Sequence, residues 1–327
     1  MVKIAVDLMG GDNAPEEIEK GVLQAVEADE DLEVLLFGLK GAYSGDHPRV
    51  EFIEVTEKIE SEDDPVRSVR RKKDSSLVRA CRAVKDGEAD ACVSAGNTGA
   101  LMSAGLFVVG RIKGVERPAI ATLLPTTGKS KEGMMLLDMG ANADNKPQHL
   151  YQFAVMADLY MRENEGRSNP TIGLVNNGSE ANKGSELTKE TYKLLEDSGL
   201  NFIGNFETRD ILSGNVDIAV TDGFTGNVIL KTIEGTAMSL MGEVKHAFLK
   251  NAKNKLAALV LKKDVQSIRN LLDYRHYGGA PLLGLNGHVL KAHGSSDSVA
   301  IVSALKQAKR MAESDAITKI KERVGEA

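Results

Sequence analysis

Short runs of apolar residues recur along the chain, and most of them end in a turn rich in glycine and small polar residues. Runs that are apolar at every position are typical of strands buried on both faces of a parallel sheet. Amphipathic stretches between the runs predict helices, for example over residues 75–86 and 186–197. The alternation predicts an α/β fold. Strands are expected at residues 3–7, 33–37, 50–54, 91–93, 119–123, 134–138, 171–175, 218–220 and 289–290.

The segment 89–110 shows this arrangement most clearly. An apolar strand ends near Val93, a turn over residues 94–99 follows, and a helix rich in small residues comes next. Gly96 and Gly99 allow a ligand to approach the backbone, while Asn97 and Thr98 add short donors. A strand, a glycine turn and a helix point backbone N–H groups at an anion. An ordinary capped turn has the same pattern, so this loop alone leaves both interpretations open.

Similar turns follow the runs that end at residues 138, 175 and 220. In an open α/β sheet, the turns after parallel strands lie along one edge, where ligands bind. We therefore expect these four turns at a single edge, forming a site for phosphate or another oxyanion. A further turn, over residues 291–297, opens the last long helix and contains His293, for which a donor role competes with a structural one.

The first turn, over residues 8–15, has a different character. It contains two adjacent glycines but lacks the GxGxxG spacing of a dinucleotide-binding turn. Asp7 and Asp12 flank it, and two carboxylates would repel a phosphate unless a cation intervened. We interpret it as a structural turn that faces a site, with Asp12 or Asn13 as the N-cap of the next helix.

Two segments are charged or apolar enough to suggest a surface function. The basic segment 65–73 places Arg67, Arg70 and Arg71 three or four residues apart, which favours an anion site over a solvated helix face. Residues 256–261 are apolar or small throughout and lie between lysines. That run is either a core or dimer-interface segment, or a protruding tip that touches an anionic membrane surface.

Composition narrows the classes of protein. The chain has 327 residues, 42% of them hydrophobic, and a net charge of −6, which argues against nucleic-acid binding. Cys81 and Cys92 lack metal-site spacing and are expected to be reduced core residues, as in a cytosolic protein. No apolar run reaches the roughly 18 residues needed to span a bilayer. A soluble protein without metal or cofactor is expected.

Nine segments, spread over nearly the whole chain, carry a joint resemblance: VDLMGGDNAP (6–15), PVRSVRRKK (65–73), SAGNTGALMSAGLF (94–107), RPAIATLLPT (117–126), LDMGANAD (137–144), NNGSEANKGSELTK (176–189), TDGFTGNVILKTIEG (221–235), YGGAPLLG (277–284) and KAHGSSDS (291–298). Taken together, these motifs resemble those of the PlsX family, the acyl-acyl-carrier-protein:phosphate acyltransferases of bacterial phospholipid synthesis. The resemblance implies a three-layer α/β/α sandwich with a mostly parallel sheet, related to phosphate acetyltransferases and isocitrate dehydrogenase. It implies a single catalytic domain over residues 1–327, a protruding helical segment over 235–275, and a homodimer.

The resemblance also implies an activity: transfer of a long-chain acyl group from acyl carrier protein to inorganic phosphate, in the cytoplasm. It further implies peripheral association with the membrane, through contact with the membrane surface or with a membrane acyltransferase. Phosphate is a dianion near neutral pH, so the protein need not supply a nucleophile. Binding phosphate against the thioester and stabilising the oxyanion are the main tasks. A CoA-dependent phosphate acyltransferase and a non-enzymatic membrane scaffold are the alternatives.

Site residues follow from the motifs and this chemistry. The proposed catalytic residues are Asn97, Lys183, Asn227 and His293. Substrate binding is assigned to Arg67, Ser94, Gly96, Thr98, Gly99, Asn142, Gly226, Ser295 and Ser296. Docking of the acidic carrier protein is assigned to Arg70, Arg71, Lys72 and Lys73. Contact with a membrane surface is assigned to Leu256, Leu259, Val260 and Leu261.

Overall fold

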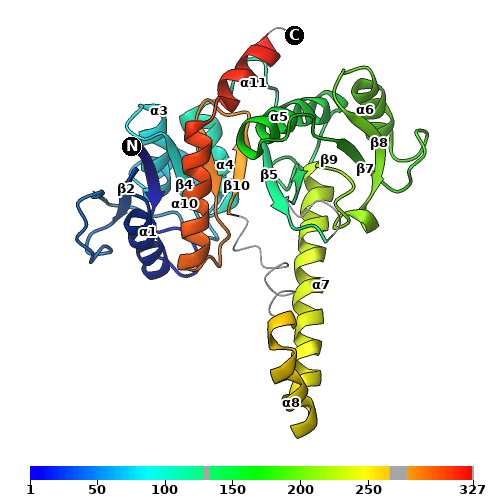
Figure 1. Cartoon of the computed structure of the whole chain (residues 1–327). Helices are drawn as coiled ribbons and strands as arrows, with labels where there is room; N and C mark the ends of the chain where they lie inside the picture. Colours follow the sequence, from blue (N-terminus) through cyan, green and yellow to red (C-terminus); the bar gives the residue numbers. More distant parts are fainter. Residues whose placement is uncertain (128–132, 266–277, 326–327) are drawn as a thin grey trace.

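The computed structural model describes residues 1–127, 133–265 and 278–325 (Figure 1). These residues form an 11-stranded sheet of order β3-β2-β1-β4-β11-β10-β5-β6-β9-β7-β8. The strands are β1 (Val2–Asp7), β2 (Leu32–Leu39), β3 (Val50–Val55), β4 (Ala91–Ser94), β5 (Ala119–Leu124), β6 (Met134–Leu137), β7 (Ile172–Asn176), β8 (Phe202–Glu207), β9 (Ile218–Val220), β10 (Ala280–Leu283) and β11 (His288–Lys291).

Helices lie on both faces of the sheet. They are α1 (Glu16–Ala28), α2 (Pro65–Arg71), α3 (Ser76–Lys85), α4 (Thr98–Ala104), α5 (Pro147–Glu165), α6 (Glu186–Glu196), α7 (Gly223–Leu249), α8 (Ala252–Val260), α10 (Ser298–Glu313) and α11 (Ala316–Gly325). A π-helical turn, Gly105–Val109, continues α4, and a 3₁₀ turn, Thr208–Asp210, follows β8.

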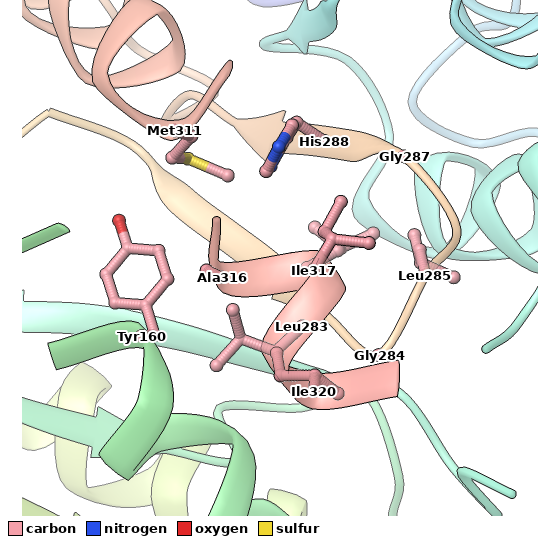
Figure 2. Close-up of a pocket in the computed structure, with 11 residues that line it drawn as sticks. Tyr160, Leu283, Gly284, Leu285, Gly287, His288, Met311, Ala316, Ile317 and Ile320 are labelled. Atoms are coloured by element: carbon pink, nitrogen blue, oxygen red, sulfur yellow. The ribbon is translucent and has the colours of Figure 1, made fainter. Parts of the chain in front are cut away.

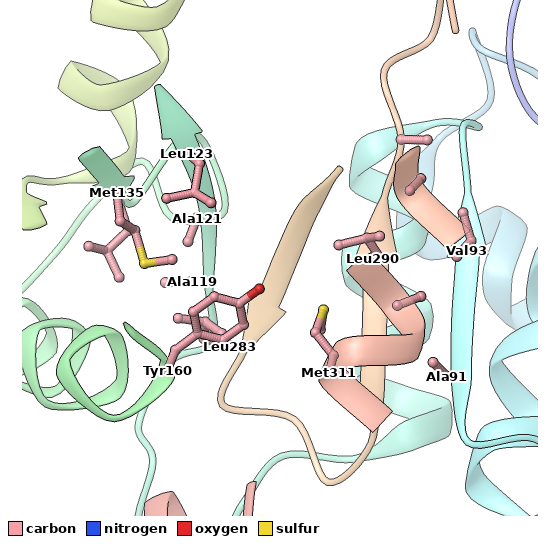
Figure 3. Packing of buried hydrophobic residues seen from close by; sticks show 14 of the residues in the cluster. Ala91, Val93, Ala119, Ala121, Leu123, Met135, Tyr160, Leu283, Leu290 and Met311 are labelled. Atoms are coloured by element: carbon pink, nitrogen blue, oxygen red, sulfur yellow. The ribbon is translucent and has the colours of Figure 1, made fainter. Parts of the chain in front are cut away.

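Two apolar cores, one on each face of the sheet, make the fold a three-layer sandwich. Alternate side chains of β1 enter different cores: Ile4 and Val6 pack with α1 and α10, whereas Ala5 packs with α3. Figure 3 shows the first core where Leu290 and Met311 approach Tyr160 of α5. The predicted three-layer, mostly parallel α/β fold is confirmed.

The direction of the strands differs from the prediction. Three antiparallel pairings, β10 with β11, β10 with β5, and β5 with β6, lie in the middle of the sheet. An odd number of reversals makes β6, β9, β7 and β8 run opposite to β1, β4 and β11. The expectation that all four glycine turns share one carboxyl edge is therefore wrong.

Three elements escaped the apolar pattern. Strand β8 is an edge strand with a single buried side chain, so it has no apolar run. Strand β10 contains Pro281, a residue more typical of turns. Helix α2 is separate from α3, because Asp64 caps it by accepting the Arg67 N–H at 2.7 Å, with Pro65 in its first turn.

Helices α7 and α8 form a stalk that projects from the body of the fold (Figure 1). The first turns of α7 are anchored by buried Gly223, Gly226 and Ile229, whereas none of its residues from Gly235 onward is buried. No helix in the described part of the chain is long and apolar enough to cross a membrane. Residues 266–275 of the predicted protruding segment lie outside the described residues.

Candidate functional site

The turns after β1, β4 and β11 lie beside one another, because these three strands are parallel neighbours in the sheet. The Asp12 N–H donates to Gly294 O at 2.8 Å, and Asn13 Nδ2 donates to Ser295 O and Ser296 O, each at 3.2 Å. Neither side chain caps α1, whose N-cap position is Pro15. The predicted capping role is wrong, because both residues bind the turn after β11 instead.

A buried carboxylate organises the space beneath these turns. Ser94 Oγ donates to Asp7 Oδ2 at 2.6 Å and accepts the Gly96 N–H at 3.0 Å. A Cβ on Gly10 would lie 2.6 Å from the Gly96 nitrogen, so the turns after β1 and β4 touch backbone to backbone. Burial raises the pKa of Asp7. Ser94 and Gly96, predicted to bind substrate, hold the shape of the turn through these bonds.

The rest of the 94–99 turn is braced by α2 and the segment before it. Asn97 Oδ1 accepts the Ala100 N–H at 3.0 Å, and its Nδ2 donates to Ser61 O at 2.9 Å. A Cβ on Gly99 would lie 2.7 Å from Pro65 Cγ. The Asn97 amide is thus an N-cap and a bridge, while Thr98 is the exposed side chain of the turn.

A second group of turns surrounds Asp138, at the carboxyl end of β6. Both oxygens of this buried carboxylate accept N–H groups, among them the Asn142 N–H at 2.8 Å. Asn142 Nδ2 donates to Pro118 O at 2.8 Å, and Asn142 O accepts the Gly223 N–H at 3.0 Å. Asn142 therefore connects the starts of β5 and α7, and its amide is buried in that role.

The first turns of α7 press against this group. A Cβ on Gly226 would lie 1.8 Å from Asp138 O, so only glycine allows the approach. The next residue, Asn227, is exposed, and its side chain lies beside Gly140. Gly226 is thus a packing residue, and it presents Asn227 at the surface of the β6 turn.

One face of α7 joins the two groups of turns. Asn227, Lys231 and Glu234 follow one another at i, i+4 and i+7, which places them on the same side of the helix. Lys231 Nζ lies 2.8 Å from Glu234 Oε2. Glu234 Oε1 lies 3.8 Å from Nε2 of His293, in the turn after β11. The turn after β6 and the turn after β11 end strands of opposite direction, yet both therefore lie next to α7.

His293 is held as a neutral donor. Its Nδ1 accepts the Ser295 N–H at 3.2 Å and lies 2.8 Å from Ser295 Oγ. Since a backbone N–H can only donate, the ring proton of the neutral form belongs on Nε2, toward Glu234. Burial is the main cause that lowers the pKa of His293, opposed by Glu234. At neutral pH, His293 presents an Nε2–H group.

The sequence motifs did not indicate Lys291, Lys231 or Glu234 as site residues. Lys291 ends β11, is 9% exposed, and lies beneath the turns after β4 and β11. A lysine at the end of an otherwise apolar strand is the signal that would have identified it. Lys231 and Glu234 lie in a continuous helix and carry no comparable signal.

Several predicted residues have contacts outside this cluster. Lys183 is exposed in the loop after β7, where its carbonyl oxygen accepts a bond from Asn176. Arg70 lies over the ring of Phe107, with 5.2 Å from Cζ to the ring centroid. Lys72 Nζ binds Asp63 Oδ2 at 2.5 Å and Lys58 O at 3.0 Å.

The remaining predicted residues differ in exposure. Arg67, Arg71 and Lys73 have exposed side chains, as do the predicted membrane residues Leu256, Leu259, Val260 and Leu261. Ser295 is exposed, whereas Ser296 is buried, and its Oγ has no hydrogen-bond partner among the residues that the structure describes. Ser296 is the one predicted substrate-binding side chain in the 291–297 turn that the fold encloses.

A cavity elsewhere in the fold has a different character. It lies between α5, α11 and the β10–β11 hairpin (Figure 2) and has a volume of about 20 Å³, room for about one water molecule. Its walls are apolar apart from Tyr160 and His288, and burial lowers the pKa of His288 to about 4. Because its walls are apolar and its volume is small, the cavity is a packing defect and not an anion site. A metal site is also not found: in the described ranges, no three His, Cys, Asp or Glu residues gather to hold a metal.

Known proteins resemble the chain over nearly its whole length. The model of the fatty acid synthesis protein family matches residues 2–319. The phosphate acyltransferase of Staphylococcus aureus (strain MSSA476) is 53% identical over 328 residues, which cover 100% of this chain and 99% of that protein.

Solved structures extend the comparison to the fold. A phosphotransacetylase from Streptococcus pyogenes has a TM-score of 0.60 at 17% identity, covering 95% of this chain and 94% of its own. A branched-chain phosphotransacylase from Enterococcus faecalis V583 has a TM-score of 0.61 at 15% identity, covering 96% and 100%. At such identities these two structures show a shared fold alone. The family match and the full-length relative confirm the resemblance seen in the motifs: the chain belongs to the PlsX family of fatty acid synthesis proteins.

Proposed function

We propose that the chain transfers a long-chain acyl group from acyl carrier protein to inorganic phosphate, and so makes acyl-phosphate for phospholipid synthesis. The chain is a phosphate acyltransferase, like its full-length relatives of the same family. The carrier protein as acyl donor is the finer part of the proposal, and a CoA thioester is the alternative donor.

The chemistry asks little of the protein beyond placement and charge. An oxygen of the phosphate dianion attacks the thioester carbonyl carbon, the C–O bond forms and the C–S bond breaks. The proton of the phosphate ends on the departing thiolate. Loss of one donor to the tetrahedral oxyanion costs about 3–4 kcal/mol, which makes oxyanion stabilisation the largest single contribution.

The observation that carries the proposal is the 3.8 Å approach of Glu234 to His293. It places a neutral Nε2–H donor next to the α7 face that also presents Asn227 and Lys231. In the proposal, the His293 Nε2–H stabilises the oxyanion or protonates the thiolate, and Asn227 contacts the phosphate. Thr98, the exposed side chain of the β4 turn, and Lys183 are proposed as further phosphate contacts.

Replacement of His293 by alanine tests this assignment. We expect kcat to fall by roughly 100-fold, the lower range for loss of a positioned acid. His246, an exposed histidine on the stalk, is the matched control, and His246→Ala is expected to leave kcat unchanged. Formation of acyl-phosphate, trapped as the hydroxamate, is the measurement. Equal kcat in both variants would remove His293 from the reaction.

A comparison of donors tests the carrier protein. Acyl carrier protein and acyl-CoA with the same acyl chain are offered to the purified protein at fixed phosphate. A kcat/KM at least tenfold higher for acyl carrier protein is expected. Equal values would favour the CoA-dependent alternative, and no phosphate-dependent release of thiol from either donor would contradict the transferase itself.

The stalk is assigned to the cytoplasmic surface of the membrane and to a homodimer. Its tip presents Leu256, Leu259 and Val260 with exposures of 66%, 70% and 77%, next to exposed lysines 253, 255, 262 and 263. Exposed leucine and valine beside lysines suit an anionic lipid surface. Exposure on this scale argues against the core interpretation of the segment. Exposed apolar positions nearer the body, such as Met238 and Leu240, suit a second copy of the chain.

A further inference from the structure

Lys291 carries a charge at one of the least exposed positions near the site. Its side chain is 9% exposed, and Nζ donates to Ala95 O at 3.1 Å and to Ala292 O. The two carbonyls belong to the turn after β4 and the turn after β11. The main chain supports the same junction, because the Ala292 N–H donates to Ser94 O at 2.9 Å. The ammonium group therefore lies directly beneath two of the turns that form the site.

Charged and titratable groups of the surrounding elements face this ammonium group. Asp7 lies under the same turn through its bond with Ser94, and Asp12 also faces Lys291. Lys231, on helix α7, also faces Lys291. His293 lies nearby, in the turn that follows Lys291 along the chain. Burial is the main cause that lowers the pKa of Lys291 to about 8, and the two aspartates oppose it.

A buried ammonium is costly unless its donors are used. Lys291 has three N–H groups, and the described residues supply two carbonyl acceptors. Among the described residues, the third N–H has no hydrogen-bond acceptor. A charge held at low dielectric acts more strongly on a nearby anion than an exposed one does. Lys231, by contrast, is 60% exposed and paired with Glu234.

We propose that Lys291 is a positioning residue for the phosphate substrate: its ammonium holds the turns after β4 and β11 together and supplies a fixed positive charge beneath the bound dianion. The inference rests on the proposed function and names the group that makes the site attractive to phosphate in a chain of net charge −6.

Substitution separates charge from packing. In Lys291→Met, the KM for phosphate is expected to rise about tenfold, the size of one lost charge-assisted hydrogen bond, with a smaller change in kcat. Lys291→Arg keeps the charge and is expected to restore most of the affinity. Thermal unfolding of each variant shows whether it is folded. A tenfold loss that arginine does not rescue would contradict the role of charge.

The pH dependence supplies a readout that a bracing role alone would not move. Lys291 is charged well below pH 8 and neutral well above it, so the wild-type KM for phosphate is expected to rise above about pH 8, by up to tenfold per pH unit. Above about pH 8 inorganic phosphate is almost entirely the dianion, so its own titration does not add to this rise. In Lys291→Met the rise is expected to disappear, whereas in Lys231→Met it is expected to remain.

The outcomes distinguish the inference from the function on which it rests. Wild-type turnover that does not depend on phosphate would overturn the proposed function. Phosphate-dependent turnover with a KM that is flat from pH 7 to 9.5 would overturn the role of Lys291 alone. If Lys291→Met does not fold, calorimetric binding of inorganic phosphate to the wild type and to Lys291→Arg at pH 7 and 9 decides: affinity lost only by the wild type at pH 9 supports the inference, and equal loss overturns it.

Discussion

The body of the fold and the α7–α8 stalk use the same kinds of apolar side chain in opposite ways. In the body, Leu101 and Phe153 are fully buried, one in each of the two cores. On the stalk, Leu259 and Val260 are at least 70% exposed. All four of these residues lie in helices, so secondary structure alone does not distinguish the two environments.

The two regions differ in the source of their stability. Burial stabilises by about 25 cal/mol per Å² of apolar surface, and the body collects this contribution within a single chain. The outer stalk gains mainly from its backbone hydrogen bonds and the contacts between α7 and α8. Its apolar side chains are free to stabilise association with another surface. The body is therefore expected to set the unfolding free energy, and the stalk to set where the molecule binds.

The largest expected difference between the two regions is in the unfolding free energy lost when one apolar side chain is replaced by alanine. Phe153→Ala removes a fully buried ring and is expected to lower the unfolding free energy by about 3–5 kcal/mol. Leu259→Ala, at the exposed tip, is expected to change it by less than about 0.5 kcal/mol. Denaturant unfolding measures both. A large loss for Leu259→Ala would mean that the stalk is part of the cooperative unit.

A charged residue at the stalk tip tests whether the exposed apolar side chains there bind a lipid surface. Leu259→Glu is expected to weaken binding to vesicles containing anionic lipid by at least tenfold, since burying one leucine contributes about 1.5–3 kcal/mol. Leu194→Glu, at an exposed leucine of the body, is the matched control and is expected to bind like the wild type. Vesicle co-sedimentation, with the molar mass checked in solution, is the measurement. Unchanged binding together with a shift from dimer to monomer would assign the tip to the dimer interface.

The basic segment on the body tests whether the donor docks there and not on the stalk. Arg71 and Lys73 are exposed, whereas Lys72 is committed to Asp63, so the double substitution Arg71→Glu, Lys73→Glu changes charge without breaking that pair. We expect kcat/KM for acyl carrier protein to fall several-fold and to lose its salt dependence, because steering is screened over about 8 Å. Turnover of a short acyl-pantetheine serves as the control. An equal fall for both donors would indicate a role in phosphate binding.

The smallest expected effect concerns an ion pair on the surface of the body. Asp29 accepts from Lys309 Nζ at 2.7 and 2.8 Å, and this contact lowers the pKa of Asp29 and raises that of Lys309. The pair therefore stabilises above the unfolded aspartate pKa of about 3.9 and below the unfolded lysine pKa of about 10.4. Asp29→Asn is expected to cost about 0.5–1 kcal/mol at pH 7 and less near pH 3. Unfolding curves at the two pH values would contradict this if the cost were the same.

The layers of the fold and most of its strands could be predicted from the amino-acid sequence. Apolar runs such as residues 134–137 are buried on both faces, and their pattern depends only on neighbours along the chain. The motifs also determined the family, and the apolar run at 256–261 singled out the stalk tip. These are local or compositional properties, so one chain is enough to recognise them.

Which strand ends lie close together could be seen only in the tertiary structure. The direction of β6, β9 and β7 relative to β11 depends on the pairing of β10 with β5, which joins segments distant along the chain. The contact of α7 with His293 depends on that arrangement. The role of a side chain depends on its neighbours too. Asn97 is a residue type suited to ligand binding, but it caps α4. Lys291 lies beneath two turns because β11 pairs with β4, a pairing that the β11 segment alone does not indicate. Periodicity records which faces are buried; it does not record what a polar side chain meets when the sheet is assembled.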